Sequence, residues 1–163
     1  MFHKVVYKIK ELIAQKGYWY EYLEHEPVRT SEEASKIRGN KYNLSQGAKA
    51  LIIRCKRGKN SERFYVMLVI PGDKKFDKKK TQAILGVKDT SFATEEQVAE
   101  ITDGIQVGGV PPFGNLFGLE VYVDKKVLAN EKIIFNAGDK RISIALKVED
   151  YLKLVNPKIV DIV

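Results

Sequence analysis

A short loop of glycines and prolines is the part of the chain best suited to chemistry. Three glycines and two adjacent prolines occur within the seven residues of GGVPPFG, residues 108–114. The prolines fix their φ angles and lack N–H groups, so the loop is stiff and cannot simply join a sheet. The glycines let another molecule approach the main chain, whose amides could grip a substrate. Such a cluster is also typical of a tight turn, and the loop alone leaves both interpretations open.

A lysine flanked by small residues is the second candidate. Lys49 lies within GAKAL, residues 47–51, at the start of a strand that the apolar residues predict. Small neighbours leave its ammonium group accessible, so the side chain could bind a phosphate as a point charge. An ordinary lysine at the edge of a strand is the alternative.

Other catalytic chemistries have little support in the sequence. The two histidines, His3 and His25, lack metal-ligand spacing, and the single Cys55 excludes a cysteine-based zinc site. No GxSxG, GxxxxGK[ST] or GxGxxG motif is present. We interpret His25 as a structural or surface residue and Cys55 as a packed strand residue. We expect neither a metal ion nor a cofactor.

The charge of the chain favours a polyanionic partner. The formal net charge is +7, and nucleic acid is the obvious candidate for a basic protein. A solvated face is the alternative for a run of lysines. The cluster predicted to contact RNA consists of Lys74, Lys75, Lys78, Lys79 and Lys80.

Hydrophobic periodicity and capping residues predict the elements that position these groups. We expect helices over about residues 3–16, 31–39, 77–85, 94–102 and 148–155. We expect strands over about residues 18–24, 48–55, 64–70, 120–123, 132–136 and 141–146. Because several neighbouring strands are joined as hairpins, the fold is α/β (α+β), with a mixed, largely antiparallel sheet and helices packed outside it.

The length and hydropathy predict the organisation of the chain. The 163 residues suit a single domain over residues 1–163, with residues 1–19 as an N-terminal helical extension. The sequence has neither a long apolar span nor a signal peptide. We therefore expect a cytoplasmic protein with no membrane partner.

Six motifs occur in one order over about residues 20–155. They are HEPVRTSEEA (25–34), GAKAL (47–51), LVIPGDKK (68–75), GGVPPFG (108–114), VYVD (121–124) and FNAG (135–138). In this order they resemble the YbaK family, also called the prolyl-tRNA-synthetase-associated editing domain. The resemblance implies a mixed, curved sheet flanked by helices, in agreement with the elements expected above.

The resemblance also implies an activity. Members of this family are trans-editing aminoacyl-tRNA deacylases, which hydrolyse the ester that joins a wrong amino acid to the 3′ end of a tRNA. A second hydrolytic site is needed because a synthetase pocket discriminates poorly against a smaller or similar side chain. The implied substrate is a small amino acid, such as Ala or Cys, mischarged on tRNA-Pro. The implied partners are the aminoacylated acceptor end of tRNA and an aminoacyl-tRNA synthetase.

The resemblance assigns the catalytic roles as follows. Lys49 would engage the phosphate or the terminal adenosine of the acceptor end. Gly108 and Pro112 would be the ends of the GxxxP loop of the family, and the Gly108 and Gly109 amides would hold the ester and its developing oxyanion. The attacking water would be positioned by the substrate's own ribose hydroxyl together with this loop.

Further positions match family residues near the pocket. Val28 and Thr30 would line the amino-acid pocket, and Asp124, Asn136 and Gly138 would lie close to it, with Asp124 orienting its neighbours rather than acting as a base. Two alternatives stay open at this point: a non-catalytic tRNA-binding module, and an interaction domain that docks on a synthetase. The first would bind tRNA in a salt-sensitive manner without deacylating it.

Overall fold

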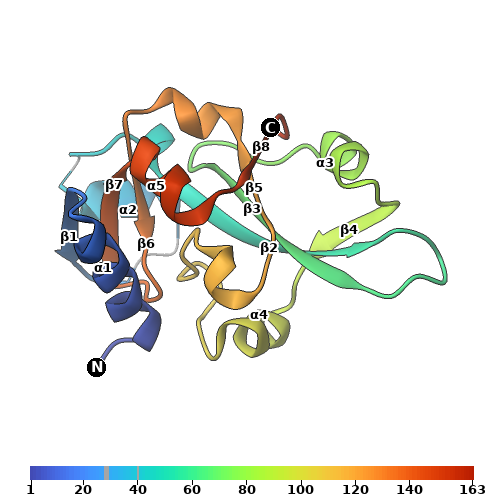
Figure 1. Cartoon of the computed structure of the whole chain (residues 1–163), viewed down its shortest axis with the longest axis horizontal. Coiled ribbons are helices and arrows are strands. Elements are labelled where there is room, and N and C mark those ends of the chain that lie inside the picture. Colours follow the sequence, from blue (N-terminus) through green and yellow to red (C-terminus); the bar gives the residue numbers. More distant parts are fainter. Residues whose placement is uncertain (28–29, 40) are drawn as a thin grey trace.

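The computed structural model describes residues 1–27, 30–39 and 41–163 (Figure 1). The α-helices are α1 (Lys4–Lys16), α2 (Ser31–Ile37), α3 (Lys78–Leu85), α4 (Glu95–Thr102) and α5 (Val148–Val155). The strands are β1 (Tyr20–Glu24), β2 (Ala48–Lys56), β3 (Phe64–Pro71), β4 (Asp89–Phe92), β5 (Val121–Asp124), β6 (Lys132–Asn136), β7 (Ile142–Lys147) and β8 (Lys158–Val160). Short 3-10 helices are η1 (Leu44–Gln46), η2 (Gly114–Phe117) and η3 (Lys125–Ala129).

The strands form two sheets. The smaller is antiparallel, with the order β1-β7-β6, and the larger has the order β4-β2-β3-β5-β8. In the larger sheet β2 pairs antiparallel with β3 and β4, whereas β5 pairs parallel with β3 and β8. A single parallel bridge from Gly47 to Ile134 brings the start of β2 next to β6. This bridge places Lys49, two residues further along β2, near β6, which is an edge strand of the smaller sheet.

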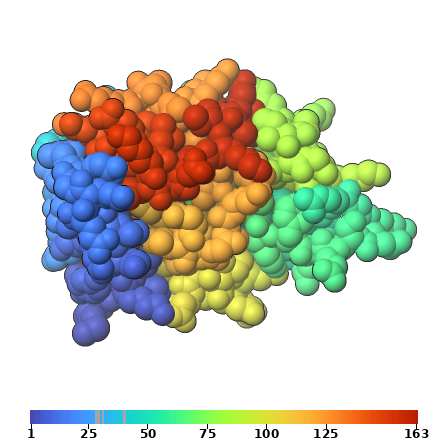
Figure 2. Space-filling view, in the orientation of Figure 1, coloured from blue at the N-terminus to red at the C-terminus, as the bar shows by residue number. Residues whose placement is uncertain are grey.

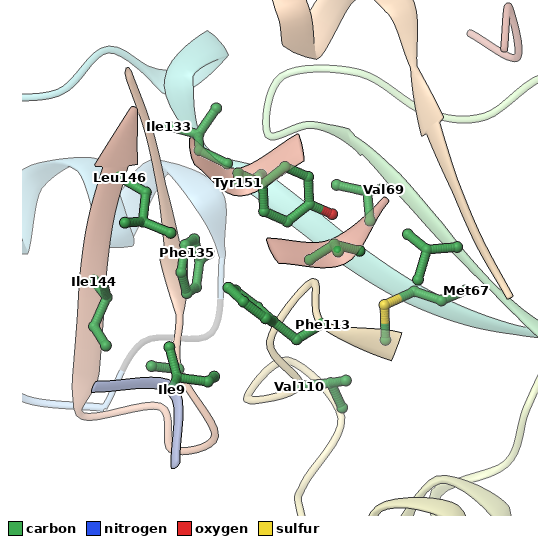
Figure 3. Close-up of a cluster of buried hydrophobic side chains, with 14 of the residues drawn as sticks. Ile9, Met67, Val69, Val110, Phe113, Ile133, Phe135, Ile144, Leu146 and Tyr151 are labelled. Carbon is green, nitrogen blue, oxygen red and sulfur yellow. The ribbon is translucent and has the colours of Figure 1, made fainter. Parts of the chain in front are cut away.

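One main core joins α1, α4 and α5 to both sheets. α1 contributes Val5, Val6, Ile9 and Ile13, all of which are buried. Figure 3 shows Ile9 among side chains of the two sheets and of the glycine–proline loop, which provides Phe113. The first helix is therefore packed into the main core. The prediction of one domain over residues 1–163 stays a prediction.

Aromatic side chains hold the glycine–proline loop against the core. The Phe113 ring packs edge-on against Tyr151 of α5 at 5.7 Å between centroids, and lies 5.5 Å from the Phe135 ring of β6 (Figure 3). The buried Tyr151 hydroxyl donates to the Pro112 carbonyl over 2.7 Å. Because Phe113 and Pro112 are fixed by these contacts, the loop is held against the core, and only Gly108 of the residues that precede Pro112 in the loop is exposed.

The β2–β3 hairpin and α3 form one end of the molecule, away from α1 (Figure 2). The two strands pair from Ala48 with Pro71 to Cys55 with Phe64, so the hairpin is long and regular. The five lysines of the predicted RNA contact lie after β3 and at the start of α3, and all are exposed. None of the helices in the described part of the chain is long and apolar enough to cross a membrane.

The predicted fold class is confirmed, and local signals located most elements. Thr30 and Thr94 cap α2 and α4, and Gly86 ends α3 in a left-handed conformation. The sequence did not indicate β4 or β8, nor did it indicate that the strands divide between two sheets.

Candidate active site

A pocket of about 380 Å³ opens where α2, the start of β2, the loop before the prolines and the end of β6 meet. Four of the predicted site residues line this one pocket: Thr30, Lys49, Gly108 and Asn136. They come from parts of the chain that are distant in sequence, and the Gly47–Ile134 bridge is the contact that brings two of these parts together. Polar and charged side chains that also line it are Ser35, Arg38, Asn43, Glu95 and Lys140.

Lys49 stands on β2 between a buried Ala48 and a half-buried Ala50. Its Nζ donates to the carbonyl of Lys74 over 2.8 Å, which ties the pocket wall to the loop after β3. Partial burial lowers the pKa of Lys49, Asp73 opposes this effect, and the charge of Lys75 adds to it. Because Lys49 forms no salt bridge with a described residue, its charge remains open to an anionic ligand.

Gly108 is one of the residues of the glycine–proline loop that line the pocket. Its φ of +90° lies in the region that favours glycine, and a Cβ there would lie 3.3 Å from Cε of Lys140. Its carbonyl accepts from Asn136 Nδ2 over 2.7 Å. Among the described residues, no acceptor is found for the Gly108 N–H. This amide is therefore available to a bound molecule.

Gly109 and Pro112 are placed differently. The Gly109 N–H donates to the Gln106 carbonyl over 2.9 Å, and the Gly109 carbonyl accepts from Gly138 over 2.8 Å. Gly109 lines a neighbouring hollow rather than the Lys49 pocket. Pro112 is buried behind the pocket and is bonded to Tyr151. In this structure the loop thus offers one of its two predicted amides to the pocket.

The remaining predicted residues divide between the wall of the pocket and its support. Thr30 caps α2 by accepting from the Glu33 N–H over 3.1 Å and lines the pocket. Val28 lies outside the described residues. Asp124 is fully buried and accepts from the N–H groups of Lys126 and Ile162, so the structure places it as a cap away from the pocket lining.

Gly138 also supports the site rather than lining it. Its φ is +114°, and a Cβ there would lie 2.2 Å from Val5 Cγ1 of α1. It lines the same neighbouring hollow as Gly109, to whose carbonyl its N–H donates. Glycine at this position lets the β6–β7 turn, which carries Asn136 and Lys140, pack closely against the first helix.

Sequence reasoning missed Arg38. Its Nε donates to Ser143 Oγ over 2.9 Å, and its Nη2 lies 3.4 Å from Asn136 Oδ1. Burial lowers the pKa of the guanidinium to about 10. An arginine at the end of a predicted helix ordinarily indicates only a favourable charge at the helix terminus, so the sequence carried no signal that distinguished it.

His25 completes this network. Its Nδ1 lies 2.8 Å from the Glu26 carbonyl, and its Nε2 lies 2.7 Å from Ser143 Oγ. Because a carbonyl oxygen only accepts, Nδ1 donates to it, and in the neutral imidazole Nε2 accepts from the serine hydroxyl. Ser143 is fully buried and does not line the pocket, so the pair is not placed to attack a substrate. The interpretation of His25 as structural agrees with this placement.

The electrostatics of the pocket favour an electron-rich ligand. Three of its lining side chains are cations, Arg38, Lys49 and Lys140, and Glu95 is an acid. None of the three cations forms a salt bridge with a described residue. Within the described residues, no three His, Cys, Asp or Glu side chains gather closely enough to hold a metal ion.

Comparison with known proteins gives relatives over most of the chain. The "Multifunctional Ser/Thr-tRNA deacylase ProXp-y" of Escherichia coli K12 is 33% identical over 151 residues, covering 92% of this chain and 87% of the relative. The "Prolyl-tRNA editing protein ProX" of Acetoanaerobium sticklandii is 31% identical over 140 residues, covering 83% and 81%.

Solved structures share the fold. The structure of hypothetical protein APE2540 superposes with a TM-score of 0.79 at 26% identity, covering 95% of this chain and 98% of that chain. A structure described as a candidate trans-editing enzyme for prolyl-tRNA synthetase superposes with a TM-score of 0.80 at 22% identity, covering 99% and 98%. The second likeness shows the fold alone.

The family assignment rests on the sequence as a whole. Residues 25–154 match the aminoacyl-tRNA editing domain, a span that contains all six motifs. The resemblance predicted from those motifs is confirmed, and the chain belongs to the aminoacyl-tRNA editing domain family.

Proposed function

We propose that this protein hydrolyses the ester bond of misacylated aminoacyl-tRNA. Membership of the editing family and relatives named as a deacylase and an editing protein support this enzyme class. The observation that carries the proposal is the pocket that holds the Lys49 ammonium and the free Gly108 amide together. The first suits a phosphate, and the second suits an ester carbonyl.

The proposed reaction needs no nucleophile from the protein. Water attacks the ester carbonyl carbon, the bond to the ribose oxygen breaks, and that oxygen takes up the proton that the water loses as the amino acid leaves. The ribose hydroxyl of the substrate positions the water. The Gly108 N–H donates to the carbonyl oxygen as negative charge develops there. Asn136 fixes the Gly108 carbonyl, and Lys49 holds the acceptor end through a phosphate.

We propose that the amino acid removed is small. A pocket of about 380 Å³ can hold a small acyl group beside Lys49 and Gly108. Ala and Cys on tRNA-Pro are the substrates that the family resemblance implies. The name of the E. coli relative adds serine and threonine to the amino acids that should be tested.

The rest of the tRNA would lie over the exposed lysines. The Lys74 carbonyl accepts the Lys49 hydrogen bond and Lys75 is the next residue, so this end of the cluster is close to the pocket. Lys78 and Lys79 continue it on the first turn of α3, and Lys80 is partly engaged by Asp161. Contact with phosphates here would make binding fall steeply with salt. A synthetase that supplies the mischarged tRNA is the further partner that we propose.

Replacing Lys49 tests the proposed site. A charge-assisted hydrogen bond contributes about 1.5–3 kcal/mol, so Lys49→Ala should lower kcat/KM by about ten- to a hundredfold. Lys49→Arg should retain part of the activity, and Lys88→Ala, which removes an exposed lysine that does not line the pocket, should retain all of it. Equal turnover by wild type and Lys49→Ala would remove Lys49 from the site. Salt-sensitive tRNA binding by an inactive wild type would favour the non-catalytic binding module instead.

A further inference from the structure

Arg38 is a half-buried cation with unused hydrogen-bonding capacity. A guanidinium has five N–H donors, and in the structure two of them are used, toward Ser143 Oγ and Asn136 Oδ1. Both acceptors are neutral. Among the described residues no carboxylate pairs with Arg38, although its side chain lines the pocket. The remaining donors are therefore left to the pocket.

Two other arginines of the chain have a carboxylate or an aromatic ring as partner. Arg141 forms a two-pronged pair with Asp139 at 2.9 and 2.7 Å, and Arg57 lies over the Phe64 ring at 4.4 Å. Taking a charge out of water without a paired charge is unfavourable. If Arg38 served only to fill space, an apolar residue at this position would make the fold more stable. An oxygen-rich ligand in the pocket would supply the missing acceptor.

The guanidinium is held in one orientation before any ligand arrives. Ser143 Oγ accepts from Nε, and the serine hydroxyl is in turn held by His25 Nε2 over 2.7 Å. On its other side Arg38 contacts Asn136, whose Nδ2 donates to Gly108. Arg38 therefore lies two hydrogen bonds from the amide loop proposed to hold the ester. Because the side chain is already ordered, it loses less conformational entropy when a ligand binds.

We propose that Arg38 is a substrate-recognition residue whose free N–H groups donate to an oxygen at the aminoacylated 3′ end of tRNA. That oxygen belongs either to the side chain of the amino acid or to the phosphate of the terminal nucleotide. The inference rests on the proposed function for the identity of the ligand. It adds to that function a contact that discriminates an oxygen-bearing group from one that lacks it, because an unmatched ligand leaves the donors unpaired.

The test uses binding rather than turnover as its main readout. The probes are short RNA minihelices ending in CCA: one uncharged, one carrying serine and one carrying alanine through a 3′ amide that is not cleaved. The variants are Arg38→Met, which keeps much of the side-chain volume, and Arg38→Lys, which keeps the charge without the planar fork. Circular dichroism and thermal unfolding confirm that each variant is folded. If Arg38→Met does not fold, Arg38→Lys carries the comparison.

Arg54 offers a matched control. Its Nε donates to Ser91 Oγ over 3.1 Å, the same kind of contact that Arg38 makes with Ser143, but Arg54 does not line the Lys49 pocket. Arg54→Met should bind all three minihelices as the wild type does. It thus measures the effect of removing a half-buried arginine bonded to a serine elsewhere in the fold.

Loss of a hydrogen bond to a charged donor should weaken binding by about ten- to a hundredfold. A loss on Arg38→Met that is confined to the seryl probe assigns the contact to the side-chain oxygen, and an equal loss on all three probes assigns it to the phosphate. Binding no weaker than that of Arg54→Met would overturn the proposal, even if turnover falls. A wild type that binds none of the probes would overturn it as well. Because the amide probes are not hydrolysed, their binding can be measured and interpreted even if the protein proves not to be a deacylase.

Discussion

Asn136 donates from its side-chain amide to the Gly108 carbonyl over 2.7 Å, across a separation of 28 residues. The bond joins the end of β6 to the glycine–proline loop and fixes the peptide group that follows Gly108. It also leaves Asn136 Oδ1 facing Arg38. One side chain thus links the proposed ester-binding loop to Arg38, the half-buried cation of the pocket.

Removing this side chain should disturb the loop. We expect Asn136→Ala to lower kcat/KM by about tenfold, because a lost hydrogen bond of this kind is worth about 1 kcal/mol and the freed loop becomes less well oriented. Steady-state deacylation kinetics measure the effect. The control is Asn115→Ala, since Asn115 makes a similar side-chain bond to the Leu154 carbonyl away from the pocket. Equal kinetics for the two variants would contradict a role for Asn136.

Gly138 should be sensitive to a single added methyl group. Alanine there would combine a φ of +114° with a Cβ placed 2.2 Å from Val5 Cγ1. We expect Gly138→Ala to lower the free energy of unfolding by about 3 kcal/mol, from backbone strain and overpacking together. Urea unfolding measures the loss. Gly17→Ala is the control: its φ is +68° but nothing lies within 4 Å of the added Cβ, so about 1 kcal/mol is expected. Equal losses at the two positions would contradict the close contact with α1.

The Asp139–Arg141 pair should make stability depend on acid pH. Hydrogen bonds from Arg141 lower the pKa of Asp139 below its ordinary value of 3.8. The unfolded chain therefore takes up a proton at a higher pH than the folded chain, so the pair stabilises the fold above pH 3.8 and this contribution is lost as the pH falls through the lowered pKa. Arg141→Gln removes the contribution.

We accordingly expect the stability difference between wild type and Arg141→Gln to be present near neutral pH and to shrink below pH 3.8. Urea unfolding over a series of pH values measures it. The control is Lys8→Gln, which removes an exposed cation with no ion pair among the described residues. A difference for Arg141→Gln that stays constant through this pH range would contradict the pairing.

Local chemistry explains what the sequence could predict. Thr30, Thr94 and Asp124 each accept a backbone N–H at the start of a helical turn, which is a short-range interaction that neighbouring residues determine. β4 and β8 were missed because they contain only 4 and 3 residues and, unlike the equally short but fully buried β5, they are mostly not buried. Periodicity also shows which face of a strand is buried but not which strand pairs with it, so the division into two sheets could not be predicted.

The sequence predicted part of the lining of the candidate site. Lys49, Gly108, Thr30 and Asn136 meet in one pocket, as the motifs that carry them suggested. Asp124 and Gly138 were expected near it, but the structure places the first as a buried cap and the second against α1. Arg38 was missed because an arginine at a helix end has the same local sequence whether it faces solvent or a pocket. Only the long-range contact with Ser143 distinguishes the two.

Deacylation of a full set of aminoacyl-tRNAs tests the central proposal most directly. The purified protein is incubated with tRNAs charged with each amino acid, Ala, Cys, Ser and Thr among them, and loss of the ester is followed with Lys49→Ala as the control. We expect accelerated hydrolysis of one or more small aminoacyl esters by the wild type and little by the variant. Wild-type rates that match spontaneous hydrolysis for every amino acid would contradict the proposed deacylase activity.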